Sequence, residues 1–366
     1  MSTIAVNAIT DANAGNTTTI NGVTPNSANV VGKNRIIGGD FTTNPWQRGT
    51  SFAAIANSGY SADRWLTAYG SAAVVTASKV VDAPTASQAG VFTQDCLSLA
   101  VTTADTSIAA GDYWLFGQHI EGLNAASFGF GQAGSRNVTL SFWVKGTKTG
   151  IHCVAIRNSA GDRSYVAEYT IVTTNTWEYK TITIPVDTSG TWLYDNGTGV
   201  SLWFVLAGGT NFHTTANTWA AGNFLATANQ VNALDSTANT FKIALVQLEA
   251  GESATEFEHR PYGTELQLCQ RYYQKFGSSS PYPRILMSAY ANNAYVGGSF
   301  PYVTSMRATP TGAFVGTWVN QNTLVSSNSI NTGPEGFLLY TQSSSIVIIA
   351  GLYPSSTGFI TLSSEL

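Results

Sequence analysis

The sequence predicts an all-β protein with an N-terminal extended arm, a jelly-roll β-sandwich, a short linking helix and a small C-terminal β-sandwich. Only 10% of the 366 residues are charged while 11% are aromatic, whereas about 25% charged residues is ordinary for a soluble domain. Short runs of alternating apolar and polar residues also recur between Gly and Asn turns, which is typical of antiparallel sheets. A chain of this length is expected to hold two or three domains.

Residues 1–33 are the arm, because they contain no aromatic residue and only seven large aliphatic ones. Thr17–Pro25 predicts a short strand followed by an Asn-Gly turn. Such a segment cannot build its own core. We expect partner chains to order it within a homotrimer, and a flexible tail is the alternative.

Residues 34–260 form the first β block. Val138–Lys145 alternates strictly, with its apolar residues on one side and Thr139, Ser141, Trp143 and Lys145 on the other. Ser201–Leu206 is apolar on both faces, which predicts a central strand. Two further strands are predicted within Trp177–Pro185 and Phe241–Leu248.

Residues 261–276 link the two blocks. Thr264 and Gln267 fit a capping box, which predicts a short helix over 264–275. Residues 277–366 are the second β block, and its C-terminal end is expected to lie in the sheet. Its predicted strands are Arg284–Ala291, Ala294–Phe300, Gly312–Val319, Gly336–Thr341, Ser345–Ala350 and Gly358–Ser363.

Composition excludes several classes of function. The net charge is -4 and Lys and Arg form no run, so we expect no nucleic-acid partner. There is no apolar stretch of membrane-spanning length, and the N-terminus lacks the pattern of a signal peptide. We therefore expect no membrane insertion. The three cysteines, Cys96, Cys153 and Cys269, are expected to be buried free thiols of a protein made in a reducing cytoplasm.

Several motifs are shared with a known family. They comprise Asp11–Gly22, Asn34–Phe41, Asn44–Gly49, Ala62–Trp65, Val246–Gly251, Phe257–Gly263 and Cys269–Tyr273. These segments resemble the opening and the internal junction of bacteriophage tail fibres and receptor-binding proteins. Residues 34–260 also resemble the jelly-roll carbohydrate-binding modules that are attached to many glycosidases.

The resemblance implies a homotrimer of the virion that is synthesised in the bacterial host cytoplasm. Residues 1–33 would dock on a phage tail or baseplate protein, and residues 277–366 would form the receptor-binding tip. The implied function is non-catalytic attachment to host cell-surface polysaccharide. Two alternatives remain: a structural fibre or adaptor component without its own receptor site, and a tailspike-type polysaccharide depolymerase.

Sugar recognition needs aromatic rings that stack on the C–H face of a pyranose, together with side chains that bind its hydroxyl groups. Two loops of the first block combine these features. The alternative is that their tryptophans close the edges of the sandwich. The predicted carbohydrate-binding residues are Trp192, Tyr194, Asp195, Asn196, His213, Asn217 and Trp219.

Other aromatic residues are open to two interpretations. Trp143, Trp177 and Trp203 lie within strand patterns and are assigned to the core or to packing between subunits. The aromatic residues of the second block either face the receptor or fill a small core and the trimer seam. They are Tyr282, Tyr290, Tyr295, Tyr302, Trp318 and Tyr340.

Catalysis and metal binding have little support in the sequence. The acidic residues of the first block are scattered, while glycoside hydrolysis requires two that flank the bond. We therefore expect no enzyme and no cofactor. The alternative for a cofactor is a structural calcium ion with Asp40 as one ligand, as the carbohydrate-binding modules that the chain resembles often carry near the first strand.

Overall fold

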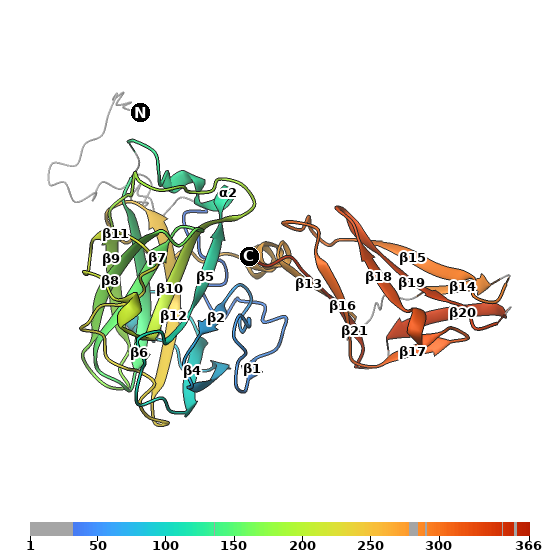
Figure 1. Cartoon of the computed structure of the whole chain (residues 1–366), viewed down its shortest axis with the longest axis horizontal. Helices are drawn as coiled ribbons and strands as arrows, with labels where there is room; N and C mark the ends of the chain where they lie inside the picture. The colour runs from blue at the N-terminus through green and yellow to red at the C-terminus, as the bar shows by residue number, and fades with distance from the viewer. Residues whose placement is uncertain (1–31, 135, 278–284, 290, 346, 355–356) are drawn as a thin grey trace, which may run out of the picture.

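A computed structural model describes residues 32–366, except 135, 278–284, 290, 346 and 355–356. The predicted arm therefore lies outside the described residues apart from its last two positions, and so do Tyr282 and Tyr290. Strands account for 43% of the structure and helices for 8%, which confirms the all-β class. Figure 1 shows a large sandwich and a smaller C-terminal block end to end, with α3 (Tyr262–Gln270) between them.

Two six-stranded antiparallel sheets make the sandwich, and we call them the first and the second sheet. In spatial order the first sheet contains β1 (Ser51–Phe52), β3 (Val74–Val80), β4 (Cys96–Thr103), β12 (Thr240–Ala250), β6 (Val138–Gly146) and β9 (Glu178–Ile184). The second sheet contains β11 (Trp219–Ala221), β8 (Arg163–Ile171), β7 (Gly150–Arg157), β10 (Thr198–Gly208), β5 (Tyr113–Glu121) and β2 (Leu66–Tyr69).

The inner faces of the two sheets form the main core. The apolar side of β6 is fully buried there, as its alternation predicts. Strand β10 lies between β7 and β5, which confirms that it is central. Phe204 on β10 stacks on Phe116 with ring centroids 5.3 Å apart and meets the edge of Phe142 at 5.0 Å. The contact of Phe204 with Phe142 therefore joins the two sheets across the core.

Short helices lie between the strands. The first, α1 (Ala86–Ala89), begins with a capping box in which Thr85 and Gln88 bond each other's backbone N–H. The others are α2 (Gly122–Ala125), η2 (Ala126–Phe128), η3 (Thr210–Phe212) and η4 (Val325–Ser327). Among the described residues, no helix has the length and apolar character needed to cross a bilayer.

The predicted capping box of Thr264 and Gln267 is not formed at the start of α3. The backbone N–H groups of Thr264 and Glu265 both donate to the carbonyl of Pro261, so the first turn already contains Thr264. Pro261 is the N-cap residue and no side chain caps the helix. The helix ends at Gln270, because Tyr273 already belongs to a strand of the C-terminal block.

Buried ion pairs join the sandwich to the C-terminal block. Arg64 is almost fully buried, pairs with Glu365 and stacks on Tyr272 at 3.6 Å. Arg48 binds the same carboxylate at 2.8 Å and Asp63 at 2.9 Å. Each of these buried charges is therefore paired, as burial of charged groups requires, and both arginines reach Glu365 across the junction.

The C-terminal block contains three three-stranded antiparallel sheets, and its described residues form a small core around Phe337 and Leu352 and a minor cluster of Ala289 and Val296. Within the predicted strand Gly312–Val319, the chain turns at Gly316, whose φ of 73° favours glycine. In spatial order the sheets are β13 (Tyr273–Gly277), β21 (Phe359–Ser363) and β16 (Thr311–Val315); β14 (Ile285–Ala289), β20 (Val347–Pro354) and β17 (Trp318–Gln321); and β15 (Tyr295–Pro301), β19 (Gly336–Gln342) and β18 (Ser329–Thr332).

Candidate functional site

An aromatic groove lies on the outer face of the first sheet. Trp143 of β6 and Tyr179 of β9 are direct cross-strand partners, and their ring centroids are 5.4 Å apart. Tyr179 is 46% exposed, although tyrosine carries a large apolar ring. These two rings form a floor that faces solvent.

Two walls rise beside this floor. Gln88 and Ala89 of α1 form one wall, and residues 254–257, which include Phe257, form the other. Leu245 lies between them, because a β-bulge in β12 gives it a φ of 50°. The walls and floor enclose about 280 Å³. We call this hollow the aromatic groove.

A buried polar network fixes the second wall. The Glu249 carboxylate accepts hydrogen bonds from the backbone N–H of Thr255 at 2.8 Å and from its hydroxyl at 2.6 Å. The Lys33 ammonium donates to the same hydroxyl and to the carbonyl of Glu256. Burial lowers the pKa of Lys33, although Glu249 and its neighbours oppose this shift. The wall is therefore held from beneath by groups that depend on one another.

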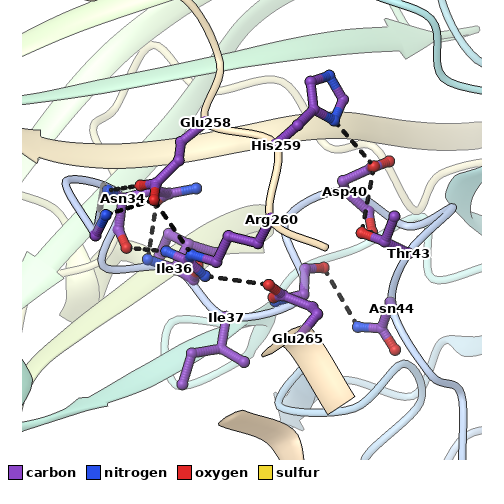
Figure 2. Close-up of polar contacts among 12 residues, drawn as sticks. Asn34, Ile36, Ile37, Asp40, Thr43, Asn44, Glu258, His259, Arg260 and Glu265 are labelled. Atoms are coloured by element: carbon purple, nitrogen blue, oxygen red, sulfur yellow. Dashed lines mark hydrogen bonds and ion pairs between the residues drawn. The ribbon is translucent and has the colours of Figure 1, made fainter. Parts of the chain in front are cut away.

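A second set of contacts continues directly from this wall (Figure 2). We call it the clasp, and it consists of Asn34, Asp40, Glu258, Arg260 and Glu265. Glu258 accepts from the backbone N–H of Asn34 at 2.7 Å. Arg260 pairs with Glu265 at 3.3 Å and also reaches the carbonyl of Asn34. The clasp ties the chain after Phe257 to the first described segment of the protein.

Asp40 is the acidic end of the clasp. Its carboxylate lies 3.5 Å from the His259 ring and accepts from the hydroxyl of Thr93 at 3.0 Å. Burial raises the pKa of Asp40, but the bonds from His259, Thr42 and Thr93 outweigh burial and lower it. Among the described residues, no group of three His, Cys, Asp or Glu side chains is placed to hold a metal ion. Calcium ligation by Asp40 therefore stays a prediction.

The clasp gives a physical role to the motifs that carry the family resemblance. Segments 34–49 and 257–273 are far apart in the sequence and meet at this place. Besides the Asn34 contact, the backbone N–H of Gly38 donates to Glu265, and the Gln47 amide donates to the carbonyl of Tyr273 at 3.1 Å. These motif residues therefore join the start of the sandwich to α3 and β13 at the junction.

The groove has the chemistry of a site for an uncharged polar ligand. Ser141 lines it next to Trp143, and the NH2 group of the Gln88 amide can donate, since its oxygen already accepts from the N–H and hydroxyl of Thr85. Of the described residues that line the groove, Glu256 is the only carboxylate. Rings, a hydroxyl group and an amide therefore converge on one hollow.

The two predicted sugar-binding loops lie side by side in the structure, but their tryptophan rings pack against each other instead of facing solvent. Trp192 stacks on Phe130 at 4.5 Å and meets Trp219 edge-on at 5.7 Å. Only 6% of Trp192 is exposed, so its ring offers no face to a pyranose. The prediction for Trp192 is corrected, and its burial agrees with the alternative of an edge-closing tryptophan. Trp219 is partly buried beside it.

The other predicted residues of these loops point to different places. Asn196 exchanges hydrogen bonds with the backbone carbonyl and the guanidinium of Arg307, at the junction with the C-terminal block. Tyr194 donates to the carbonyl of Phe130, and Asp195 accepts from the backbone of Gly197.

His213 and Asn217 belong to the loop that precedes β11. A His213 ring nitrogen lies 2.8 Å from the carbonyl of Gly208. Asn217 is exposed in a turn with a φ of 59°. A role in sugar binding stays a prediction for these two residues and for the exposed part of the other loop.

Sequence reasoning missed Trp143, Tyr179 and Phe257. Trp143 was expected in the core or between subunits; it packs on the buried cluster around Trp177 with one part of its ring and also lines the groove. The alternation of Val138–Lys145 already placed Trp143 on the polar side of its strand. A tryptophan among serine, threonine and lysine was the available signal. Trp177 and Trp203 are buried, and the three cysteines are buried free thiols, as predicted.

Comparisons with known proteins identify no family. No protein-family model matches the chain, and no curated protein sequence matches it. Similar solved structures include the enzymatically active domain of tailspike protein 4 from bacteriophage CBA120, with 15% identity and a TM-score of 0.32 over 60% of this chain. This chain spans only 21% of that tailspike chain.

Two binding modules are also similar in part. TmCBM61 in complex with β-1,4-galactotriose has 11% identity and a TM-score of 0.29, covering 59% of this chain and 98% of its own. The family 11 carbohydrate-binding module of a Clostridium thermocellum cellulase has 15% identity and a TM-score of 0.27, covering 56% and 97%. With such low scores, the properties of these proteins are not assigned to this chain.

Proposed function

We propose that this protein binds neutral glycans through the aromatic groove. The observation that carries the proposal is the open pair of Trp143 and Tyr179 on the outer face of the first sheet, enclosed by two walls. An exposed aromatic hollow on a folded surface marks a binding site more often than a structural need.

The chemistry of the groove fits sugar rings. The rings of Trp143 and Tyr179 offer apolar faces for the C–H face of a pyranose. Gln88, Ser141 and Glu256 supply polar atoms for its hydroxyl groups. A volume of about 280 Å³ lies near the lower end of ordinary ligand pockets. It suits a short stretch of a longer polysaccharide.

Within this proposal, the chain is the receptor-binding part of a phage tail fibre in the virion. The motif resemblance supports this role, and so does the absence of charge runs that would favour nucleic acid. Residues 1–33 attach three copies to the tail or baseplate. Three weak sites on one particle then give avid attachment to a repetitive host polysaccharide.

The proposed function is binding without cleavage. Glycoside hydrolysis uses two carboxyl groups that flank the bond, and among the described residues the groove is lined by Glu256 alone. A depolymerase would need a second carboxylate from another element.

Binding of the full-length chain to an array of bacterial O-antigen and capsular polysaccharides tests the proposal. We expect Trp143→Ala to lose at least ten-fold in signal on every glycan that the groove recognises. Tyr262→Ala is the matched control, because Tyr262 is 54% exposed on α3 and lies outside the groove. Equal binding by both variants, or no binding by the intact chain, overturns the proposal.

Two further measurements address the finer statements. Light scattering of the intact protein is expected to give the mass of a trimer, and a stable monomer contradicts the fibre assignment. Chromatography of a bound polysaccharide after long incubation is expected to show no released oligosaccharides. Release that depends on Glu256 would replace binding by hydrolysis.

A further inference from the structure

A second hollow lies on the outer face of the sheet formed by β15, β19 and β18 in the C-terminal block. It encloses about 470 Å³ and is lined by Tyr295, Gly297, Asn331, Leu338 and Tyr340. Figure 1 shows these strands in the part of the block that projects beyond the junction. This sheet shares no lining residue with the aromatic groove.

The strand register explains why a hollow forms there. Gly297 is the cross-strand partner of Tyr340, while Tyr295 and Tyr340 meet with ring centroids 5.8 Å apart. A Cβ atom on Gly297 would lie 2.8 Å from the Cβ of Tyr340, closer than side chains pack. Glycine thus keeps the floor low between two tyrosine rings.

The core of the block does not need these side chains. Along β19, Phe337 and Leu339 point inward and are buried, while Leu338 and Tyr340 point to the other face. Tyr295 is 69% exposed and Leu338 is 39% exposed. Large apolar side chains that are costly to expose and unused by the core indicate a ligand surface.

The polar groups around the hollow favour a neutral ligand rich in hydroxyl groups. Asn331 is exposed beside Leu338, and its amide can donate and accept. A neighbouring hollow of about 660 Å³ shares Asn331 and Leu338 and continues past Ser299 to Glu335. Among the described residues that line the two hollows, Glu335 is the only charged one.

We propose that this face of the C-terminal block is a second saccharide-binding site, separate from the aromatic groove. The two hollows form adjoining subsites for successive sugar residues, with the Tyr295 and Tyr340 rings as the stacking platform. A second copy of the chain is the alternative occupant, and the sedimentation measurement below distinguishes it. Each chain then carries two glycan sites.

The test uses the full chain and the same polysaccharide array in four versions. Trp143→Ala with Tyr179→Ala removes the aromatic groove, and Tyr295→Ala with Tyr340→Ala removes the second platform. The third version combines both pairs, and the fourth is Tyr262→Ala as control. We expect the groove-deficient protein to keep binding a subset of the glycans, and the combined variant to lose at least ten-fold on that subset.

The other outcomes overturn either the inference or the proposed function, and they are distinguishable. Residual binding that does not depend on Tyr295 and Tyr340 places the site elsewhere, and a groove-deficient protein that binds nothing shows that there is no second site. An unchanged signal in the groove-deficient protein counts against the proposed function alone. Sedimentation of Y295A/Y340A is expected to match the unmodified chain, whereas a lower oligomeric state would make the face an interface between copies. Thermal melting confirms that each variant is folded.

Discussion

The outer faces of the two sandwich sheets differ in how far other segments cover their aromatic residues. On the second sheet, Trp203 is only 2% exposed, and it is enclosed by the His119 ring at 5.1 Å and the Arg157 guanidinium at 5.8 Å. Leu225 and Ala226, from the long segment after β10, complete the same apolar cluster. On the first sheet, the neighbourhood of Trp143 and Tyr179 stays open between two walls.

The difference shows that the chain segment packed over a strand decides whether a tryptophan on its outer face is buried or open to a ligand. The closed face is buried, and this burial lowers the pKa of His119 to about 4. On the open face, Glu249 and Lys33 hold the crossing segment at one side of the rings. Four substitutions break or sharpen this contrast.

Trp203→Ala is expected to have the largest effect, on stability. Removing a fully buried tryptophan costs about 3–5 kcal/mol through lost burial and a cavity. Urea unfolding measures this loss, and glycan binding of the remaining folded protein should be unchanged. A cost below about 1 kcal/mol would mean that the second face is not closed as described.

Trp143→Ala is expected to show the reverse pattern. Its partly buried ring contributes little to the core, so we expect a loss of stability of about 1 kcal/mol. Affinity for glycan should fall by about 30-fold, or about 2 kcal/mol, as for a central aromatic contact. Titration calorimetry measures the affinity, and a variant as unstable as Trp203→Ala would erase the contrast between the faces.

Glu249→Gln is expected to weaken binding without touching the floor of the groove. The new amide replaces one of the two carboxylate oxygens by an NH2 donor, so either the N–H or the hydroxyl of Thr255 loses its acceptor. An unsatisfied buried group costs about 1–3 kcal/mol. Movement of the wall relieves part of this cost and disturbs the groove. We expect affinity to fall about three- to ten-fold, while exposed Glu252→Gln on the same segment stays unchanged.

Asp40→Asn is expected to give the smallest effect, a loss of stability that is present near neutral pH and disappears in acid. The pKa of Asp40 is lowered in the folded protein, so its stabilising contribution is complete above the unfolded value near 4. That contribution is lost as the pH falls through the lower folded value. Urea midpoints measured from about pH 6 down to about pH 2 should therefore decline less steeply for the variant. An identical slope would show that the clasp does not depend on the Asp40 charge.

More of the sandwich than of the candidate site could be predicted from the sequence. Alternation in Val138–Lys145 and the doubly apolar run at Ser201–Leu206 follow from local periodicity, and both strands were found as expected. The groove depends on Phe257 returning across β6, more than a hundred residues later in the chain. No local pattern reports such a contact. Trp192 was misjudged for the same reason, because its partner Phe130 comes from another loop.

The start of the helix also required long-range information. Thr264 and Gln267 satisfy the local rule for a cap, but Glu265 is drawn to the backbone of Gly38 and to Arg260. The hollow of the C-terminal block similarly depends on the register that sets Gly297 opposite Tyr340. Register between distant strands is fixed by the whole sheet and not by one run of residues.

The C-terminal block leaves the sandwich and returns to it at one place. Strand β13, where the chain departs, pairs with β21, where it comes back, and Tyr273 faces Ser363. Two residues later, Glu365 is gripped by Arg48 and Arg64 (Figure 1 places the chain end here). A mechanical force on the distal sheets is therefore distributed over two paired strands and over the ion pairs of Glu365. Because both connections of the C-terminal block lie at the same place, the whole block can also be exchanged for another without interrupting the chain of the sandwich.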